Sequence, residues 1–146
     1  MGSPPYQNNQ DMKNQTAIIN KLASAWKCDF KPLSDAKYIV DYVGHREGDI
    51  PLCLVEVKRR NRNFDEFKDI LLSVHKVVRG SEFAEYIGVP FFFCVQWNDR
   101  IAYRKIEIGE KFEIKLMGGG RENREDELDI EPCVRIPTDE KWRAIE

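Results

Sequence analysis

The amino-acid sequence predicts an α/β domain in which a mixed central β-sheet is flanked by helices. Two observations support this fold class. Segments with apolar residues every three or four positions alternate with β-branched and aromatic runs, in the order helix, three strands, helix, strand (αβββαβ). The run from Pro51 to Lys58 is apolar on both faces almost to its end, as in a central strand that is covered from both sides.

The first predicted elements are a helix and an edge strand. Residues 1–10 combine prolines with amide side chains, and we expect them to be disordered. A single domain, residues 11–146, follows. Its first helix runs from about Asp11, a suitable N-cap, to Trp26, with apolar residues on one helical face. Residues 28–33 can form a short edge strand, which is broken by Pro32, a residue without an N–H to donate to a neighbouring strand.

The next two strands, Lys37 to Val43 and Pro51 to Lys58, should pair as a β-hairpin, since a polar turn with two glycines separates them. With the turn centred midway between the two runs, Asp41 lies roughly opposite residue 53. A stagger, a bulge or the twist of the sheet is then needed to bring Asp41 beside Glu56.

A second helix is predicted from Asn61 to Gly80, because its apolar residues recur at three- and four-residue steps. Asn63 and Glu66 form a capping-box-like pair near its start, and Gly80 is a suitable end. A short helix, Ser81 to Ile87, follows.

Three more strands complete the prediction, at Val89 to Trp97, Ile101 to Ile106 and Phe112 to Met117. The return from the Glu56 strand through the second helix to the Val89 strand should be a parallel, right-handed crossover.

The composition limits the class of protein. The chain has 146 residues, the size of one domain. Residues 1–120 carry 18 basic and 16 acidic side chains, whereas residues 121–146 carry 5 and 9, so a mildly basic body bears an acidic C-terminal extension. No apolar run could span a membrane and no apolar signal core is present, so we expect a cytoplasmic protein without a membrane partner.

The four cysteines are scattered, and none forms a C-x-x-C pair. Zinc sites normally contain such close pairs, so this spacing argues against zinc and predicts buried free thiols.

Three ionisable residues, Asp41, Glu56 and Lys58, form the candidate catalytic site. Glu56 and Lys58 are two positions apart on one strand, so their side chains project from the same face. Two neighbouring carboxylates repel each other and favour a cation between them, and oxygen ligands of this kind suit Mg²⁺. The backbone carbonyl of Val57 is a further candidate ligand. Bound Mg²⁺ neutralises charge on a phosphate and lowers the pKa of a bound water, which Lys58 can orient or deprotonate.

A Glu-x-Lys pair alone is weak, because a solvent-facing ion pair at the edge of an amphipathic strand would also explain it. The context favours a catalytic site. An aspartate lies on the hairpin partner, a long apolar strand precedes the pair, and a basic cluster follows it. That cluster, which can contact DNA phosphates, consists of Arg59, Arg60 and Arg62.

The arrangement resembles the PD-(D/E)XK nuclease superfamily, whose pattern is an acidic residue on one strand, D/E-x-K on the next, and then a helix and a strand. Residues 12–106 follow this pattern. The phrases VEVKRRNRNFDEF, ILLSVHKV and GVPFFFCVQWND, and the ending GGGRENREDELDIEPCVRIP, are similar to small phage-type members of the Holliday junction resolvase and restriction-endonuclease-like kind. The resemblance implies a restriction-endonuclease-like core in which the acidic stretch is an ordered part of the domain.

The resemblance also implies Mg²⁺-dependent hydrolysis of phosphodiester bonds in DNA, with Mn²⁺ as a substitute. Asp41 and Glu56 would be the metal ligands and Lys58 the catalytic lysine. An endonuclease of phage or mobile-element DNA metabolism, acting on branched or recombination intermediates in the host cytoplasm, fits this description. A homodimer is compatible with it, because many relatives pair to cut both strands. The alternative is a non-catalytic nucleic-acid-binding or virion-associated domain on the same fold.

The sequence departs from the superfamily pattern at two places. Val40 precedes Asp41 where the family has proline, and the Ser-Asp pair ending at Asp35 is closer to the P-D pair, so Asp35 is a rival. We prefer Asp41, because it lies inside the hairpin strand. Gln15 stands nearest to the glutamate that many members carry on the first helix, and a neutral amide is a poorer cation ligand. Lys76 matches a helix lysine that can contact phosphate.

Overall fold

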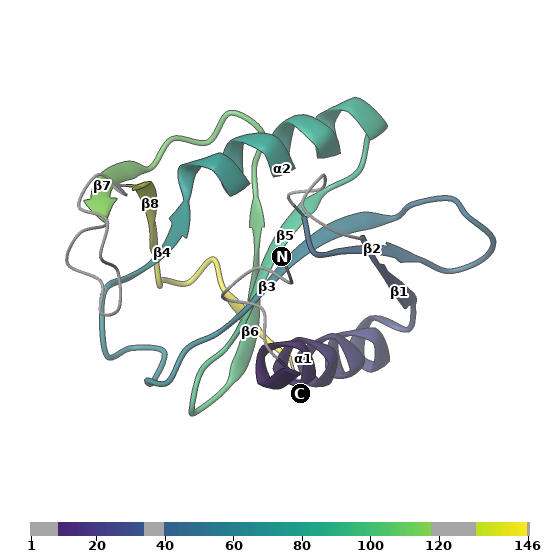
Figure 1. Ribbon diagram of the computed structural model, residues 1–146, viewed down its shortest axis with the longest axis horizontal. Coiled ribbons are helices and arrows are strands. Elements are labelled where there is room, and N and C mark those ends of the chain that lie inside the picture. Colours follow the sequence, from purple (N-terminus) through teal and green to yellow (C-terminus); the bar gives the residue numbers. More distant parts are fainter. Residues whose placement is uncertain (1–8, 34–39, 118–130, 146) are drawn as a thin grey trace.

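The computed structural model describes residues 9–33, 40–117 and 131–145. The described residues form two helices and nine strands, and Figure 1 shows how they are arranged around a central sheet. In chain order these elements are α1 (Asn9–Trp26), β1 (Asp29–Pro32), β2 (Tyr42–His45), β3 (Cys53–Arg59), β4 (Asp69–Ser73), α2 (Val74–Ile87), β5 (Phe91–Gln96), β6 (Ile101–Ile106), β7 (Glu113–Met117), β8 (Glu131–Pro137) and β9 (Arg143–Ala144).

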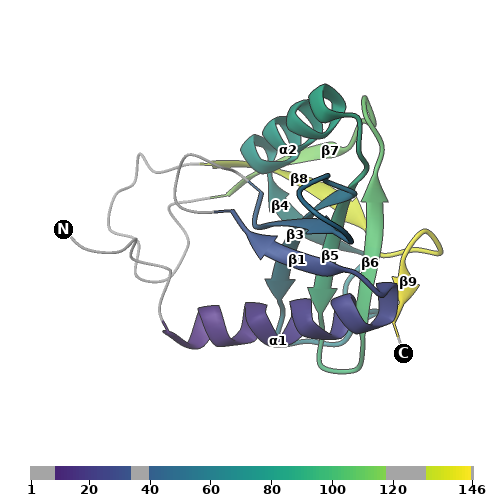
Figure 2. The same ribbon diagram turned by 90° about the vertical axis from the view of Figure 1, so that its right-hand side faces the viewer.

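The central sheet has six strands in the order β1-β2-β3-β5-β6-β9. The β3–β5 pair is parallel and the other pairs are antiparallel, so the sheet is mixed. Strands β4, β8 and β7 form a second, antiparallel sheet. Helices α1 and α2 lie on opposite sides of the central sheet (Figure 2). The predicted fold class and the parallel return from β3 through a helix to β5 are therefore confirmed.

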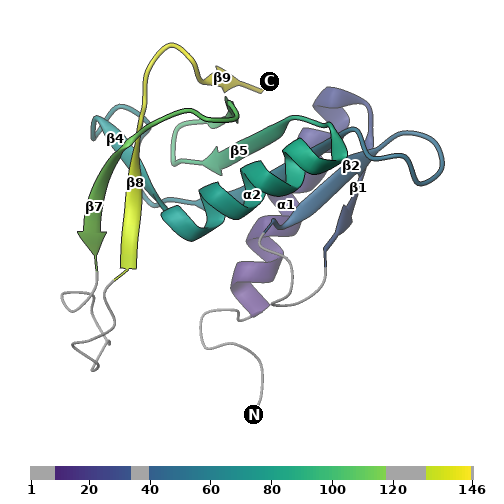
Figure 3. The same cartoon turned by 90° about the horizontal axis from the view of Figure 1, so that it is seen from above.

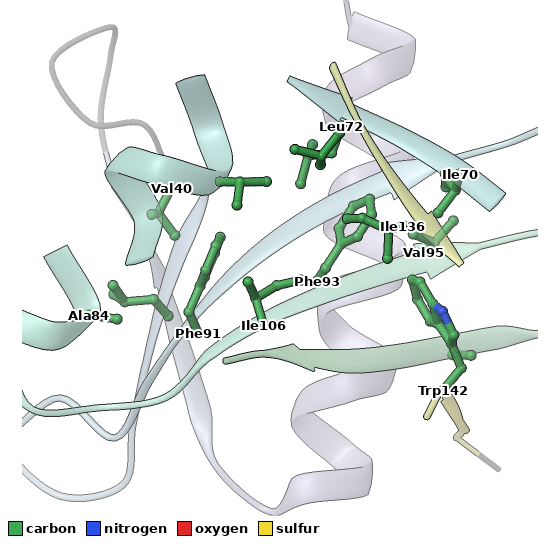
Figure 4. Packing of buried hydrophobic residues seen from close by; sticks show 14 of the residues in the cluster. Val40, Ile70, Leu72, Ala84, Phe91, Phe93, Val95, Ile106, Ile136 and Trp142 are labelled. Atoms are coloured by element: carbon green, nitrogen blue, oxygen red, sulfur yellow. The ribbon is translucent and has the colours of Figure 1, made fainter. Parts of the chain in front are cut away.

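Two hydrophobic clusters fill the two sides of the central sheet. On the α1 side, Ile18 and Leu22 belong to one cluster with Val55 and Val57 of β3. On the other side, residues of β5 pack against α2 and the three-stranded sheet, where Phe91, Phe93 and Val95 meet Ile70, Leu72, Ile136 and Trp142 (Figure 4). Because side chains alternate along a strand, Glu56 projects toward this second side. The fold thus places a carboxylate between the sheet and α2.

The hairpin register differs from the prediction. Tyr42 pairs with Val55 and Gly44 pairs with Cys53, so continuing the same register brings Asp41 opposite Glu56 rather than residue 53. The turn is centred later than the midpoint of the two apolar runs, and Gly48 within it adopts a left-handed φ of 63°. No bulge is needed to bring the two acidic residues together.

The predicted helix from Asn61 to Gly80 is wrong in its first half. Residues 69–73 form β4, because Ile70 and Leu72 point into the core opposite Ile136 and Val134 of β8. The apolar pattern of this segment fits a period of two as well as 3.6, and the partner strand decides between them. The Asn63–Glu66 pair exists as a local turn, in which the Asn63 N–H donates to Glu66 Oε1 at 3.0 Å, but no helix continues from it.

Gly80 does not end the second helix, and Ser81 does not begin a separate one. Helix α2 runs unbroken to Ile87 and ends at Gly88, whose φ of 78° is left-handed. Gly80 lies inside α2 against the ring of Phe91, where an added Cβ would come within 2.5 Å of the ring. The absence of a side chain at this position therefore allows α2 to pack closely against β5.

The first and last segments differ in part from the prediction. Helix α1 begins at Asn9, so the last two residues of the segment 1–10 are helical, and residues 1–8 lie outside the described residues. Strand β2 runs from Tyr42 to His45 after a bend at residues 40 and 41, and the start of the predicted strand, residues 37–39, lies outside the described residues. Within the acidic extension, β8 and β9 are integral strands of the two sheets, and residues 121–130 lie outside the described residues.

All four cysteines are free thiols, and Cys53, Cys94 and Cys133 are buried, as predicted, whereas Cys28 is only half-buried. In the described ranges, no helix combines the length and the apolarity needed to cross a membrane.

Replacing Gly80 by alanine tests the packing of α2 on β5. Alanine favours helix by about 1 kcal/mol over glycine, but its methyl group would overlap the buried Phe91 ring. We expect Gly80→Ala to lower the free energy of unfolding by about 1–3 kcal/mol in urea titrations. Arg79→Ala, at the exposed neighbouring position, is the control and should change it little. A Gly80→Ala protein as stable as the parent would contradict this packing.

Candidate active site

Asp41 lies beside Glu56, just outside the end of β2, where one edge of β3 has no further strand partner among the described residues. The backbone N–H of Val57 donates to Asp41 Oδ2 at 2.9 Å. The aspartate side chain thus accepts the hydrogen bond that a backbone carbonyl of a neighbouring strand would otherwise accept. In a strand, the N–H and C=O of one residue leave on the same side, so the Val57 carbonyl is directed toward the Asp41 side as well. This local geometry follows directly from the hairpin register.

Glu56 is almost completely buried, with 1% of its surface exposed. Its Oε2 accepts a hydrogen bond from Lys76 Nζ of α2 at 2.7 Å, while Oε1 is buried without a hydrogen-bond partner in the described part of the chain. Burial, followed by the neighbouring charge of Asp41, raises the pKa of Glu56 to about 7, although Lys76 and Lys58 act in the opposite direction. A solvent-facing ion pair is therefore not the explanation of the Glu-x-Lys motif.

Asp41 shares this environment. Burial raises the pKa of its carboxyl group, while Lys76, the Val57 N–H and Lys58 stabilise its charged form. The charge of Asp41 in turn raises the pKa of Glu56. A proton on Glu56 thus relieves the repulsion between the two groups when no cation is present.

Lys58 lies on the same face of β3 as Glu56 and is half-buried. Burial and the positive charges of Lys76 and Arg60 lower its pKa to about 8, against the opposing effect of Glu56 and Asp41. An amine with this pKa is partly neutral near physiological pH and can accept a proton.

Lys76 is the fourth charged group of the cluster, and α2 aims it at β3. Burial alone would lower the pKa of Lys76, but the carboxylates of Glu56 and Asp41 raise it above its ordinary value, with a smaller contribution from Glu131 at the start of β8. Sequence reasoning did not single out Glu131, because only the pairing of β8 with β4 brings it near α2.

The arginines of the basic cluster after Lys58 mainly contact other groups of the chain. Arg59 donates to the carbonyl oxygens of Arg60 and Gln96 at 2.6 and 3.3 Å. Arg62 donates to the carbonyl of Asp69 at 2.8 Å, and its guanidinium lies 4.6 Å from the centre of the Phe67 ring. These arginines hold the loop that follows β3.

Gln15 and Asp35 are the two alternative ligand candidates predicted from the sequence. Gln15 is half-buried on α1, and among the described residues no hydrogen bond connects it to Asp41 or Glu56. Asp35, the rival of Asp41, lies outside the described residues.

The donor set fits a hard divalent cation. The Asp41 and Glu56 carboxylates are neighbours, one oxygen of Glu56 has no hydrogen-bond partner among the described residues, and the Val57 carbonyl points to the same side. No group of three or more Asp, Glu, His or Cys side chains exists within residues 9–33, 40–117 and 131–145, so a cation here would take its remaining ligands from the backbone, water or substrate.

Comparisons with known proteins bear on this site. A family described as "Phage putative PDDEXK endonuclease" matches residues 1–144 of the chain. Among solved structures, the chain is similar to Hjc, a Holliday junction resolvase from the archaeal hyperthermophile Archaeoglobus fulgidus, with 21% sequence identity and a TM-score of 0.48 over 68% of this chain and 79% of that chain. No curated protein matches the chain.

The pH dependence of stability tests the burial of Glu56. Its pKa rises from an ordinary 4.5 to about 7 in the folded protein, so ionisation of Glu56 destabilises the fold increasingly across that interval and fully above it. In a chelating buffer near pH 8, we expect Glu56→Gln to be more stable than the parent by about 1–3 kcal/mol, and we expect the difference to vanish toward pH 4.

Glu82→Gln, at an exposed position of the same helix as Lys76, is the matched control and should show no such pH-dependent gain. A Glu56→Gln protein that is less stable than the parent at high pH would show that the Lys76 ion pair outweighs the cost of burial.

Proposed function

Because the chain belongs to this family of phage PDDEXK endonucleases, we propose that it hydrolyses phosphodiester bonds in DNA with Mg²⁺ at the cluster of Asp41, Glu56 and Lys58. The family membership confirms the resemblance seen in the sequence. The observation that carries the residue assignment is the burial of Glu56 beside the half-buried Asp41, with one Glu56 oxygen that has no hydrogen-bond partner among the described residues. Such a pair is costly for a purely structural domain, because both charges are desolvated.

Asp41, Glu56 and the Val57 carbonyl would hold the cation, which would neutralise charge on the scissile phosphate and lower the pKa of a bound water. Carboxylate and carbonyl oxygens suit Mg²⁺, and Mn²⁺ should substitute for it. Lys76 already neutralises part of the carboxylate charge through its bond to Glu56 Oε2.

Lys58 is the group proposed to move a proton. Its lowered pKa of about 8 supports removal of a proton from the attacking water, and its charged form can stabilise the negative charge of the transition state. Lys58 projects from the same face of β3 as Glu56, so its amine would act on a water or phosphate bound beside the carboxylates.

We propose branched or recombination intermediates of phage or mobile-element DNA as substrates. The DNA would approach the open edge of β3 beside Asp41. Of the arginines in the loop after β3, Arg60 and Arg62 are half-buried and hold backbone carbonyls, so their contribution to DNA binding would be to shape the loop as much as to contact phosphates.

Cleavage assays with linear, nicked, flapped and four-way DNA in Mg²⁺ or Mn²⁺ test the proposal. We expect cleavage by the parent and at least a ~100-fold loss for Glu56→Gln, Asp41→Asn and Lys58→Ala, because each removes a metal ligand or the proton acceptor. Lys105→Ala, an exposed lysine on β6, is the control and should cut normally.

If the parent binds these DNAs but cuts none of them with either ion, the domain is the non-catalytic binder that the sequence allows. Cleavage by Lys58→Ala at the parent rate would contradict the role of Lys58.

The role of Lys58 as a base has a separate signature. Its amine loses a proton near pH 8, so the cleavage rate of the parent should rise with pH up to about that value and then level off. Lys58→Arg keeps the positive charge but stays protonated, and it should be slow at every pH without this rise. A Lys58→Arg protein with the parent's rate and pH profile would assign Lys58 to charge stabilisation alone.

A further inference from the structure

Strand β7 forms an outer edge of the three-stranded sheet. The strand order is β4-β8-β7, and in the described parts of the chain β7 pairs with β8 alone. Figure 3 shows β7 on the outer side of β8, away from the central sheet. An edge strand presents a row of unpaired N–H and C=O groups, which is a template for pairing with another strand.

The apolar face of this sheet continues onto β7 but leaves the core there. Ile114 pairs with Val134, which is buried, yet Ile114 itself is 53% exposed and Leu116 is 68% exposed. The two side chains point to the same face, because they are two positions apart. They extend the core face of the sheet into solvent, where nothing described covers them.

The opposite face of β7 carries charges that favour a partner strand with opposite charges at the facing positions. Glu113 and Lys115 are two positions apart and both exposed, and among the described residues Glu113 makes one long ion pair, at 3.9 Å to Arg135. In an antiparallel pair, the residues directly opposite one another share a face, and opposite charges there are favourable. Glu113 and Lys115 of one β7 could therefore pair with the opposite charges of a second, antiparallel copy of β7.

Among the twofold registers of β7 with itself centred on residues 113 to 115, one pairs opposite charges on one face and apolar side chains on the other. Centred on Ile114, it places Glu113 of each copy opposite Lys115 of the other, with the two Ile114 side chains facing each other and Leu116 opposite Phe112. Centred on Glu113 or on Lys115, it places like charges opposite each other. A half-residue shift places apolar side chains opposite charged ones.

We propose that β7 is a dimerisation edge, at which a second copy of this chain adds its own β7 antiparallel about a twofold axis through Ile114. The interface would be isologous and would join the two three-stranded sheets into one continuous sheet. A contact of five residues per strand is small, so we expect a weak dimer that forms with rising protein concentration. The proposal does not depend on nuclease activity.

Charge exchange tests the register. Sedimentation equilibrium of the full chain over a micromolar concentration series should show a monomer–dimer equilibrium. Lys115→Glu and Glu113→Lys each place like charges opposite each other, and each should weaken the dimer at least ~10-fold. The double variant with both substitutions restores opposite charges and should return the dissociation constant to near that of the parent.

Cysteine cross-linking provides a second, geometric measurement. At the axis, two opposite residues have Cα atoms ~4.5–5.5 Å apart, within disulfide range, so Ile114→Cys should form a covalent dimer on mild oxidation. Leu116→Cys is the matched control on the same exposed face. Its two copies are offset by four residues, roughly 14 Å along the strands, and should not link. The parent, with its native thiols, gives the background.

A parent that stays monomeric throughout the concentration series would overturn the proposal. So would single charge variants that dimerise as tightly as the parent, or a double variant that remains as weak as the single ones. Efficient linking of Leu116→Cys without linking of Ile114→Cys would place any dimer in another register. Circular dichroism of each variant separates these results from a loss of folding.

Discussion

The buried pair of carboxylates is the constraint on which the rest of this structure depends. Two like charges in one desolvated place are unfavourable unless cations accompany them. The fold supplies Lys58 from the same strand as Glu56 and Lys76 from the helix that crosses above it. The hairpin register brings Asp41 alongside, and its bond from the Val57 N–H holds it there. The repulsion between the two carboxylates is thus balanced by groups that β3, helix α2 and the hairpin supply.

That arrangement explains why β3 combines apolar residues with ionisable ones. Its apolar residues fill both clusters, and they anchor a strand whose alternate positions carry the ionisable groups. The Gly80 contact with Phe91 lets α2 pack closely on the sheet, which brings Lys76 within 2.7 Å of Glu56. The second sheet supports the start of α2, because β4 leads directly into the helix. Membership of the PDDEXK endonuclease family supports the proposal that this cluster binds a divalent cation for DNA cleavage.

Sequence reasoning predicted the fold class and the acidic cluster, since both depend on local patterns, namely the apolar runs and the Glu-x-Lys spacing. It could not fix features that tertiary partners decide. The segment around Ile70 fits a helix or a strand, and pairing with β8 made it β4. Gly80 resembles a helix end in isolation, although Phe91, which it contacts, lies in the next strand. The contribution of Glu131 depends on sheet pairing that carries no local signal.

The central claim is that Asp41 and Glu56 together hold a divalent cation, and thermal unfolding in the presence of Mn²⁺ or Mg²⁺ tests it most directly. A ligand that binds only the folded protein raises its stability as the ligand concentration exceeds the dissociation constant, by about 2.7 kcal/mol at a hundredfold excess. The account predicts that either ion raises the unfolding temperature of the parent in a saturable manner, and that Asp41→Asn and Glu56→Gln abolish this rise while both proteins remain folded. An unfolding temperature of the parent that does not respond to either ion, or a response that both variants retain, would contradict it.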